Sequence, residues 1–409
     1  MRILFVTMFP LETNTSATMQ NKGVIEGLIR LGHVVDLLTC RPNPQSISYD
    51  DATDFNKTIN EIYHLDLDNK YSMFMTKKIS NTNDSILKPF LYKIIRSTVK
   101  CFVENFFIFD AQKSNIKNLK RLSIDFSIYD CIISSSDPKS SHLIVDKIKK
   151  SSKNYRFKWI QYWGDPMFHD VTRKKDWRDS LVKYGENRLL KKADRIVYAS
   201  PTTLEQQKKT FTMHSSKMDY ASQATLHYGT KSKERHNETN GEVVIGYYGA
   251  YFSSIRDIIP LYNSFLDSKY KLEICGNTDL KLIGTSNISI YNHKNYEEIK
   301  RFEENADILV CLCNKNGTQI PGKIYYCAGY NKPIIIILDG PNKSVLREYF
   351  DSFNRYITCD NNIESIRKAI NMARSLTMDF TFKLDERLST VFFAEKIVNK
   401  IYWEEKNER

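Results

Sequence analysis

Hydrophobic positions along the chain alternate between short continuous apolar runs and segments with helical spacing. The run at 2–7, RILFVT, is bounded by polar residues, as expected of a strand buried on both faces of a parallel sheet. A helix is predicted from about Ala17 to Leu31, ended by Gly32, and a second strand follows at 33–39. The first forty residues therefore predict one right-handed βαβ unit of a Rossmann-like domain.

The same rhythm resumes further along and then starts afresh in the second half of the chain. In the first half, strands are predicted at 131–134, 157–162 and 195–199, with helices at 138–150, 177–192 and 201–209. In the second half, strands are predicted at 243–248, 272–275, 288–291, 308–312 and 334–338, with helices at 257–266 and 296–305. The polar stretch 210–241 between the two series is the best candidate for a linker.

This pattern predicts an α/β protein made of two tandem Rossmann-like domains that face each other across a cleft. We place the first domain at 1–228 and the second at 229–385, and expect an amphipathic helix at 386–409 to complete the first. Open α/β sheets bind ligands at the carboxyl ends of their strands, so the cleft is the expected site.

One long segment, 41–125, interrupts the first domain with a basic and aromatic insertion. Within it, residues 86–110 mix Lys and Arg with bulky apolar side chains. This composition fits a helix that lies in a membrane interface, and it equally fits a core helix whose exposed face is basic. Both interpretations stay open from the sequence.

Composition narrows the classes of function. A length of 409 residues is ample for two cores, and a net charge of +12 indicates an anionic partner. No nucleic-acid-binding module is visible, no apolar run approaches the roughly 20 residues of a membrane-spanning helix, and the apolar N-terminus fits a strand better than a signal peptide. We expect a cytoplasmic protein that binds no nucleic acid. The eight cysteines form no CxxC pair, which predicts buried free thiols and no metal site.

The strongest local sign of chemistry is the stretch 318–339, TQIPGKIYYCAGYNKPIIIILD. A Gly-Lys turn that opens a helix presents free backbone N–H groups to an anion, and Lys323 adds a cation there. The ordinary alternative is a surface turn followed by a helix and a buried strand. The surrounding chain decides between the two.

Five segments, in the same order, resemble the GT-B glycosyltransferases, and their residues resemble the retaining group known as family 4. The likeness covers most of the chain except the insertion. The segments are 27–39 (GLIRLGHVVDLLT), 191–209 (KKADRIVYASPTTLEQQKK), 245–265 (IGYYGAYFSSIRDIIPLYNSF), 296–313 (YEEIKRFEENADILVCLC) and 321–337 (PGKIYYCAGYNKPIIII).

The resemblance implies a nucleotide-sugar donor in the second domain. Lys323 and Arg256 would stabilise the charge that builds on the leaving diphosphate, since fixed cations act on developing charge. The remaining donor-site residues would be Gly249, Gln319, Pro321, Gly322 and Tyr326. Tyr326 stands where the family has an acid that holds the ribose.

In the first domain, Asp165 and His169 follow a predicted strand. A carboxylate and an imidazole at that edge can orient an acceptor hydroxyl or the donor sugar, whereas a turn and a plain loop residue are the alternatives.

We therefore predict a glycosyltransferase that moves a sugar, from a donor expected to be UDP-linked, to a lipid-linked or cell-surface glycan. The resemblance implies retention of configuration without a metal or other cofactor. The segment 86–110 would hold the enzyme at the inner face of an anionic membrane. The alternatives are a catalytically silent GT-B protein that binds a nucleotide sugar or a partner, and a GT-B sugar-nucleotide epimerase.

Overall fold

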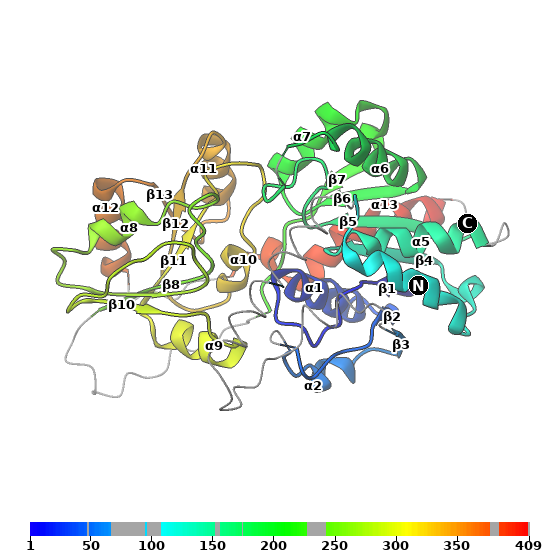
Figure 1. Ribbon diagram of the computed structural model, residues 1–409, viewed down its shortest axis with the longest axis horizontal. Helices are drawn as coiled ribbons and strands as arrows, with labels where there is room; N and C mark the ends of the chain where they lie inside the picture. The colour runs from blue at the N-terminus through cyan, green and yellow to red at the C-terminus, as the bar shows by residue number, and fades with distance from the viewer. Residues whose placement is uncertain are drawn as a thin grey trace.

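A computed structural model describes most of the chain. The described residues are 1–46, 49–66, 95, 108–151, 156–173, 175–226, 243–376 and 384–407. Figure 1 shows two α/β domains side by side along the longest axis, and both termini lie at the first of them. The two tandem Rossmann-like domains predicted from the sequence are thus confirmed.

The first domain is built on a parallel sheet of seven strands in the order β3-β2-β1-β4-β5-β6-β7. Its strands are β1 (Arg2–Val6), β2 (Val34–Cys40), β3 (Glu61–Leu65), β4 (Cys131–Ser136), β5 (Lys158–Trp163), β6 (Arg195–Tyr198) and β7 (Met218–Tyr220). In the central register Val6 lies between Leu38 of β2 and Ser134 of β4. The central strands are apolar almost throughout because helices cover both faces of the sheet.

Helices α1 (Ser16–Arg30), α2 (Thr53–Asn56), α5 (Ser140–Ser151), α6 (Asp179–Lys192) and α7 (Pro201–Thr210) follow these strands. Shorter 3₁₀ segments are η1 (Ala111–Arg121), η2 (Phe126–Ile128) and η3 (Thr212–Lys217). Helix α1 begins where the Thr15 hydroxyl accepts a hydrogen bond from the Thr18 backbone N–H, at 3.2 Å. It ends before Gly32, whose φ of +79° only glycine adopts readily.

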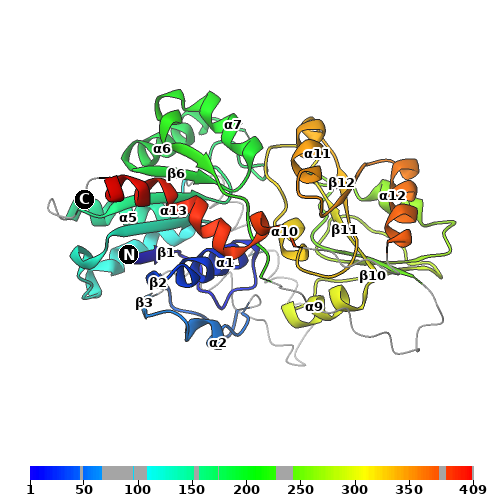
Figure 2. The same ribbon diagram turned by 180° about the vertical axis from the view of Figure 1, so that it is seen from behind.

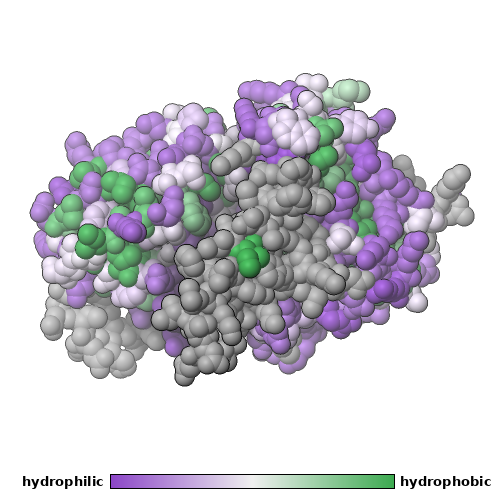
Figure 3. All heavy atoms as spheres, in the orientation of Figure 1, coloured by the Kyte–Doolittle hydropathy of each residue, from purple (hydrophilic) through white to green (hydrophobic). Residues whose placement is uncertain are grey.

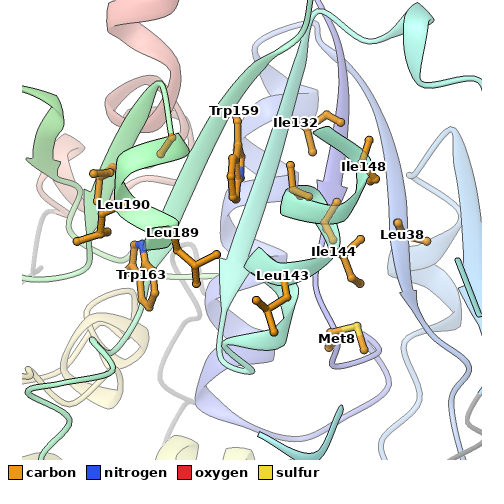
Figure 4. Close-up of a cluster of buried hydrophobic side chains, with 14 of the residues drawn as sticks. Met8, Leu38, Ile132, Leu143, Ile144, Ile148, Trp159, Trp163, Leu189 and Leu190 are labelled. Carbon is orange, nitrogen blue, oxygen red and sulfur yellow. The ribbon is translucent and has the colours of Figure 1, made fainter. Parts of the chain in front are cut away.

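One face of the first sheet carries a dense apolar core. Trp159 and Trp163 of β5 lie on one face of the strand and are fully buried, and α5 and α6 pack over them with Ile144, Leu189 and neighbouring side chains (Figure 4). A single buried hydroxyl satisfies two ring groups there: Ser134 Oγ accepts from Trp159 Nε1 at 2.8 Å and lies 2.7 Å from His142 Nδ1. This packing fixes the end of β5, which leads into the cleft.

The second domain repeats the design on a parallel sheet of six strands in the order β10-β9-β8-β11-β12-β13. Its strands are β8 (Val244–Tyr248), β9 (Lys271–Cys275), β10 (Ile288–Tyr291), β11 (Ile308–Leu312), β12 (Ile334–Leu338) and β13 (Ile357–Asp360). Its helical segments are α8 (Ile259–Ser264), α9 (Tyr296–Asn305), α10 (Lys323–Cys327), α11 (Lys343–Asp351), α12 (Ile363–Ser375) and η4 (Glu386–Leu388).

The last helix, α13 (Thr390–Asn407), returns to the first domain. Figure 2 shows it lying along the first domain beside α1. Phe393 is fully buried in the first core, with its ring centroid 5.5 Å from that of Tyr162. The helix approaches α1 so closely that a Cβ added to Gly27 would lie 1.9 Å from the Thr390 carbonyl oxygen.

Two sequence predictions need correction. The stretch 210–241 is not wholly a linker, because η3 and β7 within it belong to the first domain and β7 pairs with β6. The insertion 41–125 is not separate from the sheet either, since β3 within it pairs with β2. The membrane prediction for 86–110 falls almost entirely outside the described residues.

Candidate active site

A cavity of about 360 Å³ lies between the domains, next to the carboxyl ends of β8, β9 and β10. Its first-domain wall is the start of α1, and the second domain supplies the rest. Of the nine residues predicted for the site, six line this cavity: Gly249, Arg256, Pro321, Gly322, Lys323 and Tyr326. Asp165, His169 and Gln319 are not among the lining residues.

Lys323 is the best-anchored cation of the cavity. Its ammonium group forms an ion pair with Glu303, whose side chain is only 6% exposed. The second oxygen of Glu303 accepts a hydrogen bond from the Tyr330 hydroxyl at 2.9 Å. Burial lowers the pKa of Lys323, but the Glu303 carboxylate outweighs burial and holds that pKa above its ordinary value. Lys323 is therefore a permanent cation at neutral pH.

The helix that begins at Lys323 has a single turn. It ends at Cys327 because Arg355 binds the carbonyl groups that follow it: Nε donates to Ala328 O at 2.8 Å and Nη2 to Tyr330 O at 2.5 Å. A helix of one turn has little macrodipole, so the positive charge at this turn comes from the Lys323 ammonium itself.

Arg256 is held over the loop that follows β8. Its Nη1 donates to Ala250 O at 2.6 Å and its Nε to Asn314 Oδ1 at 3.0 Å. Tyr247 OH donates to the same Ala250 carbonyl at 2.9 Å. These bonds fix the guanidinium beside Gly249, on the same cavity that Lys323 lines.

The Gly322 position brings the two domains into contact. A Cβ there would lie 2.6 Å from Ser16 Oγ and 2.7 Å from Gln223 Oε1, so only glycine fits without a shift. Beside it, Tyr326 OH donates to Ser16 O at 2.7 Å. Burial raises the pKa of Tyr326 above its ordinary value, so the phenol is neutral at pH 7. Tyr326 is thus a neutral bridge between the domains.

Glu303 is the functional candidate that the sequence analysis missed. Among the cavity-lining residues of the described chain it is the one carboxylate. It sits in the last turn of α9, the helix before β11, and meets Lys323 across 20 positions of sequence. The residue pattern of α9 is that of an ordinary surface helix with one polar side. Nothing in that segment therefore indicates a functional role for Glu303.

Asp165 follows β5 and lies in a cluster of carboxylates around one lysine. Lys139 pairs with Asp137 at 2.5 Å and with Asp170 at 2.9 Å. Burial, together with the charge on Asp137, raises the pKa of Asp165 to about 7, although Lys139 acts in the opposite direction. A carboxyl group that titrates near neutral pH can accept a proton from a hydroxyl.

His169 and Gln319 connect the domains outside the cavity lining. Gln319 Nε2 donates to His169 O at 3.2 Å, and His169 Nε2 lies 2.8 Å from the Thr210 hydroxyl. Nearby, the carbonyl of Thr318 accepts from the hydroxyl of Thr202 at 2.7 Å. The geometry gives His169 and Gln319 a place in the contact between domains.

Among the described residues, no group of three or more His, Cys, Asp or Glu side chains is arranged to hold a metal ion. No described helix is long and apolar enough to cross a bilayer. The seven cysteines in this part of the chain are free and buried.

Two Rossmann-like domains with a shared cavity at their strand ends define the GT-B fold, and this chain has it. Sucrose-phosphate synthase from Thermosynechococcus elongatus superposes with a TM-score of 0.61 at 11% identity, covering 100% of each chain. The apo form of the lipopolysaccharide outer core galactosyltransferase WaaB gives 0.54 at 14% identity, over 99% of this chain and 100% of that one.

An alpha-glucosyltransferase solved with UDP and a 13-mer DNA containing a HMU base gives a TM-score of 0.53 at 10% identity, over 100% of this chain and 98% of that one. No protein-family model and no curated protein matches the sequence. At these identities the likeness establishes the fold.

Proposed function

We propose that this protein is a glycosyltransferase that moves a sugar from a nucleotide-sugar donor to a lipid-linked or cell-surface glycan. One observation carries the proposal: two fixed cations, Arg256 and Lys323, line one cavity between the domains of a GT-B fold. The departure of a nucleoside diphosphate concentrates negative charge, and preorganised cations stabilise that charge in the transition state.

The proposed donor is UDP-linked. UDP is the nucleotide in the similar alpha-glucosyltransferase structure, which supports this choice. The aromatic ring of Tyr296 and the apolar side chain of Ile299 line the cavity after β10 and offer a surface for a base. Because Tyr326 is no carboxylate, we assign the acceptor of ribose hydroxyl hydrogen bonds to Glu303.

The proposed reaction retains the anomeric configuration and needs no metal, in keeping with the resemblance to family 4. The two cations supply the charge stabilisation at the diphosphate. The departing phosphate takes the proton of the acceptor hydroxyl, and we assign the orientation of that hydroxyl to Asp165 of the first domain. The segment 86–110 stays the predicted contact with an anionic membrane, and the cytoplasmic location stays a prediction.

The test begins with binding and turnover. We expect UDP-sugars to raise the melting temperature more than GDP- or dTDP-sugars, since a ligand bound only by the native state stabilises it. Slow hydrolysis of the bound donor, measured as released nucleotide, should follow. Glu303→Gln should weaken binding of UDP-sugar more than binding of inorganic pyrophosphate, which has no ribose. An equal loss for both ligands would show that Glu303 acts only by holding Lys323.

A catalytically silent binder is the second candidate. Two observations favour it: the charge of Lys323 is already paired with Glu303, and Tyr326 carries no negative charge. Binding of a nucleotide sugar with no turnover, over a broad panel of donors and acceptors, would select this reading. Release of a changed sugar from UDP-sugar would instead identify an epimerase, the third candidate.

A further inference from the structure

An exposed apolar surface lies on the first domain, away from the cavity. Trp177, Leu181, Tyr184 and Met213 are exposed by 74%, 46%, 67% and 88%. We call these four residues the α6 surface. Leu181 and Tyr184, three positions apart, stand on one face of α6, and Trp177 lies in the turn just before the helix begins at Asp179. Figure 3 shows pale and green side chains among purple ones in this part of the domain.

Met213 of η3 lies next to this face. His214 Nε2 lies 2.9 Å from Asn187 Oδ1 of α6, and Lys217 Nζ donates to Lys191 O at 3.0 Å. These two bonds hold η3 against the second half of α6. The four exposed apolar side chains therefore come from α6, from the turn that leads into it, and from η3, which is bonded to α6.

The α6 surface has no part in the core of its own domain. The opposite face of α6 supplies that core with Val182, Leu189 and Leu190, which are at most 4% exposed. Near the middle of α6, a Cβ added to Gly185 would lie 3.5 Å from the Ile108 side chain. Since α6 is already packed on one side, its exposed apolar cluster points to an external partner.

The charge around the α6 surface is positive. The same face of α6 continues with the exposed residues Arg188 and Lys191, and Lys175 and Lys183 are exposed nearby. The carboxylates at the start of the helix are paired with arginines: Asp176 with Arg178 at 2.5 Å, and Asp179 with Arg173 at 2.5 Å. A group of apolar side chains bordered by basic residues is complementary to a surface in which anionic groups cover an apolar layer.

We propose that the α6 surface binds the interface of an anionic lipid bilayer. Trp and Tyr side chains favour the headgroup level because they have an apolar ring and a polar edge, while Leu181 and Met213 enter the acyl boundary. Arg188 and Lys191 contact lipid phosphates. None of its four residues belongs to the segment 86–110, and its binding to lipid does not depend on sugar transfer.

The position of the α6 surface relates it to the cleft. The loop that joins β5 to α6 contains His169, whose carbonyl accepts from Gln319 of the second domain. In the same loop, Val171 Cγ2 would lie 3.2 Å from a Cβ at Gly317. This loop runs from the contact between domains to Trp177. A lipid-linked acceptor would then reach the cleft from the bilayer along one short loop, a step that rests on the proposed function.

Vesicle flotation of the full chain tests the proposal. We expect binding to vesicles of phosphatidylglycerol mixed with phosphatidylcholine, weaker binding at high salt, and little binding to phosphatidylcholine alone. Trp177→Ser with Tyr184→Ser should reduce binding at least about tenfold. The control is Ile283→Ser with Met372→Ser in the second domain, where these side chains are 76% and 57% exposed. Equal binding of the two double variants would overturn the proposal.

Tryptophan fluorescence supplies an independent measurement. Trp159 and Trp163 are fully buried, whereas Trp177 is exposed and should shift to shorter wavelength when vesicles are added. Trp177→Phe should remove this shift and keep most of the binding. A shift that follows protein concentration without vesicles, with a doubled mass in light scattering, would show instead that the surface binds a second copy. Vesicle binding without a shift of the Trp177 fluorescence would also overturn the proposal, and neither result depends on transferase activity.

Discussion

The two domains carry charge clusters of opposite sign near the ends of their strands. On the second domain, the buried carboxylate of Glu303 binds the cation Lys323, and Arg256 lines the same cavity. On the first domain, one cation, Lys139, lies among three carboxylates that follow β4 and β5, including Asp165. Glu303 holds Lys323 in an ion pair, and Lys139 holds Asp137 and Asp170 in the same way.

In the proposed reaction the two clusters would serve different chemical tasks. Fixed cations suit the diphosphate of a donor, which is negative at every working pH. Carboxylates suit an acceptor hydroxyl, because they accept its hydrogen bond. Two similar sheets therefore carry clusters of opposite charge, and the side chains after the strands make the distinction.

The largest expected effect is on the second-domain side. Lys323→Ala should lower turnover about 100-fold or more, since removal of one preorganised stabilising group costs about 2.7–4 kcal/mol at the transition state. The matched control is Lys343→Ala, which removes a lysine that is 53% exposed and 3.4 Å from Asp360. Steady-state kinetics, with a donor that has been shown to bind, measures the turnover of both variants. Equal turnover in the two variants would remove Lys323 from the proposed site.

The next largest effect concerns the packing of α13 against α1, which completes the first domain. Gly27→Ala should destabilise the protein by about 1–3 kcal/mol, because its Cβ would collide with the Thr390 carbonyl. Gly23→Ala on the same helix is the control, since its Cβ would lie 3.7 Å from the Phe393 ring, an ordinary contact. Urea unfolding of both variants measures the difference. Similar stability for both would show that α13 does not hold its place on α1 in solution.

A pH effect should distinguish the first-domain side. The pKa of Asp165 is raised in the folded state, so the folded protein binds more protons than the unfolded chain between about pH 4 and 7. Its contribution to stability is therefore lost as pH rises through that window. Asp165→Asn should flatten the fall of the melting temperature over this range.

Other groups share that window, so the comparison needs a matched variant. Burial raises the pKa of Glu186 to about 7 as well, and the pKa of Asp137 is raised in the same cluster. Asp279→Asn is the control, because hydrogen bonds from Ser253 lower the pKa of that exposed carboxylate. If Asp165→Asn and Asp279→Asn gave the same pH profile, the raised pKa of Asp165 would be wrong.

Much of the fold was accessible from the sequence because buried parallel strands are continuous apolar runs. The strands 308–312 and 334–338 and the helix 296–305 were predicted with the bounds that the structure shows. By contrast, β3 (EIYHL) is only partly buried and β7 has three residues, so neither forms such a run. Edge strands of this kind depend on pairing with a neighbour rather than on their own pattern.

The candidate site was accessible only where residues follow a motif. The Gly-Lys turn and Arg256 belong to recognisable segments, and both line the cavity. Glu303 was missed because its role arises from contact with Lys323, a tertiary fact that helical spacing does not encode. The short extent of α10 is likewise unmarked in its own segment, since Arg355, distant in sequence, binds the carbonyl groups just beyond its end.

The smallest expected effect tests the contact between the two sides themselves. Tyr326→Phe removes the hydroxyl that donates to Ser16 O and leaves that carbonyl without this partner. Such a neutral hydrogen bond contributes about 0.5–1.5 kcal/mol, so we expect a rise of severalfold in KM for the donor with little change in kcat. The control is Tyr262→Phe, which removes a bond of 2.9 Å to Ile283 O inside the second domain. A kcat that falls with Tyr326→Phe and not with Tyr262→Phe would give the Tyr326 hydroxyl a part in the chemical step. The cations Lys323 and Arg256 alone would then no longer explain turnover.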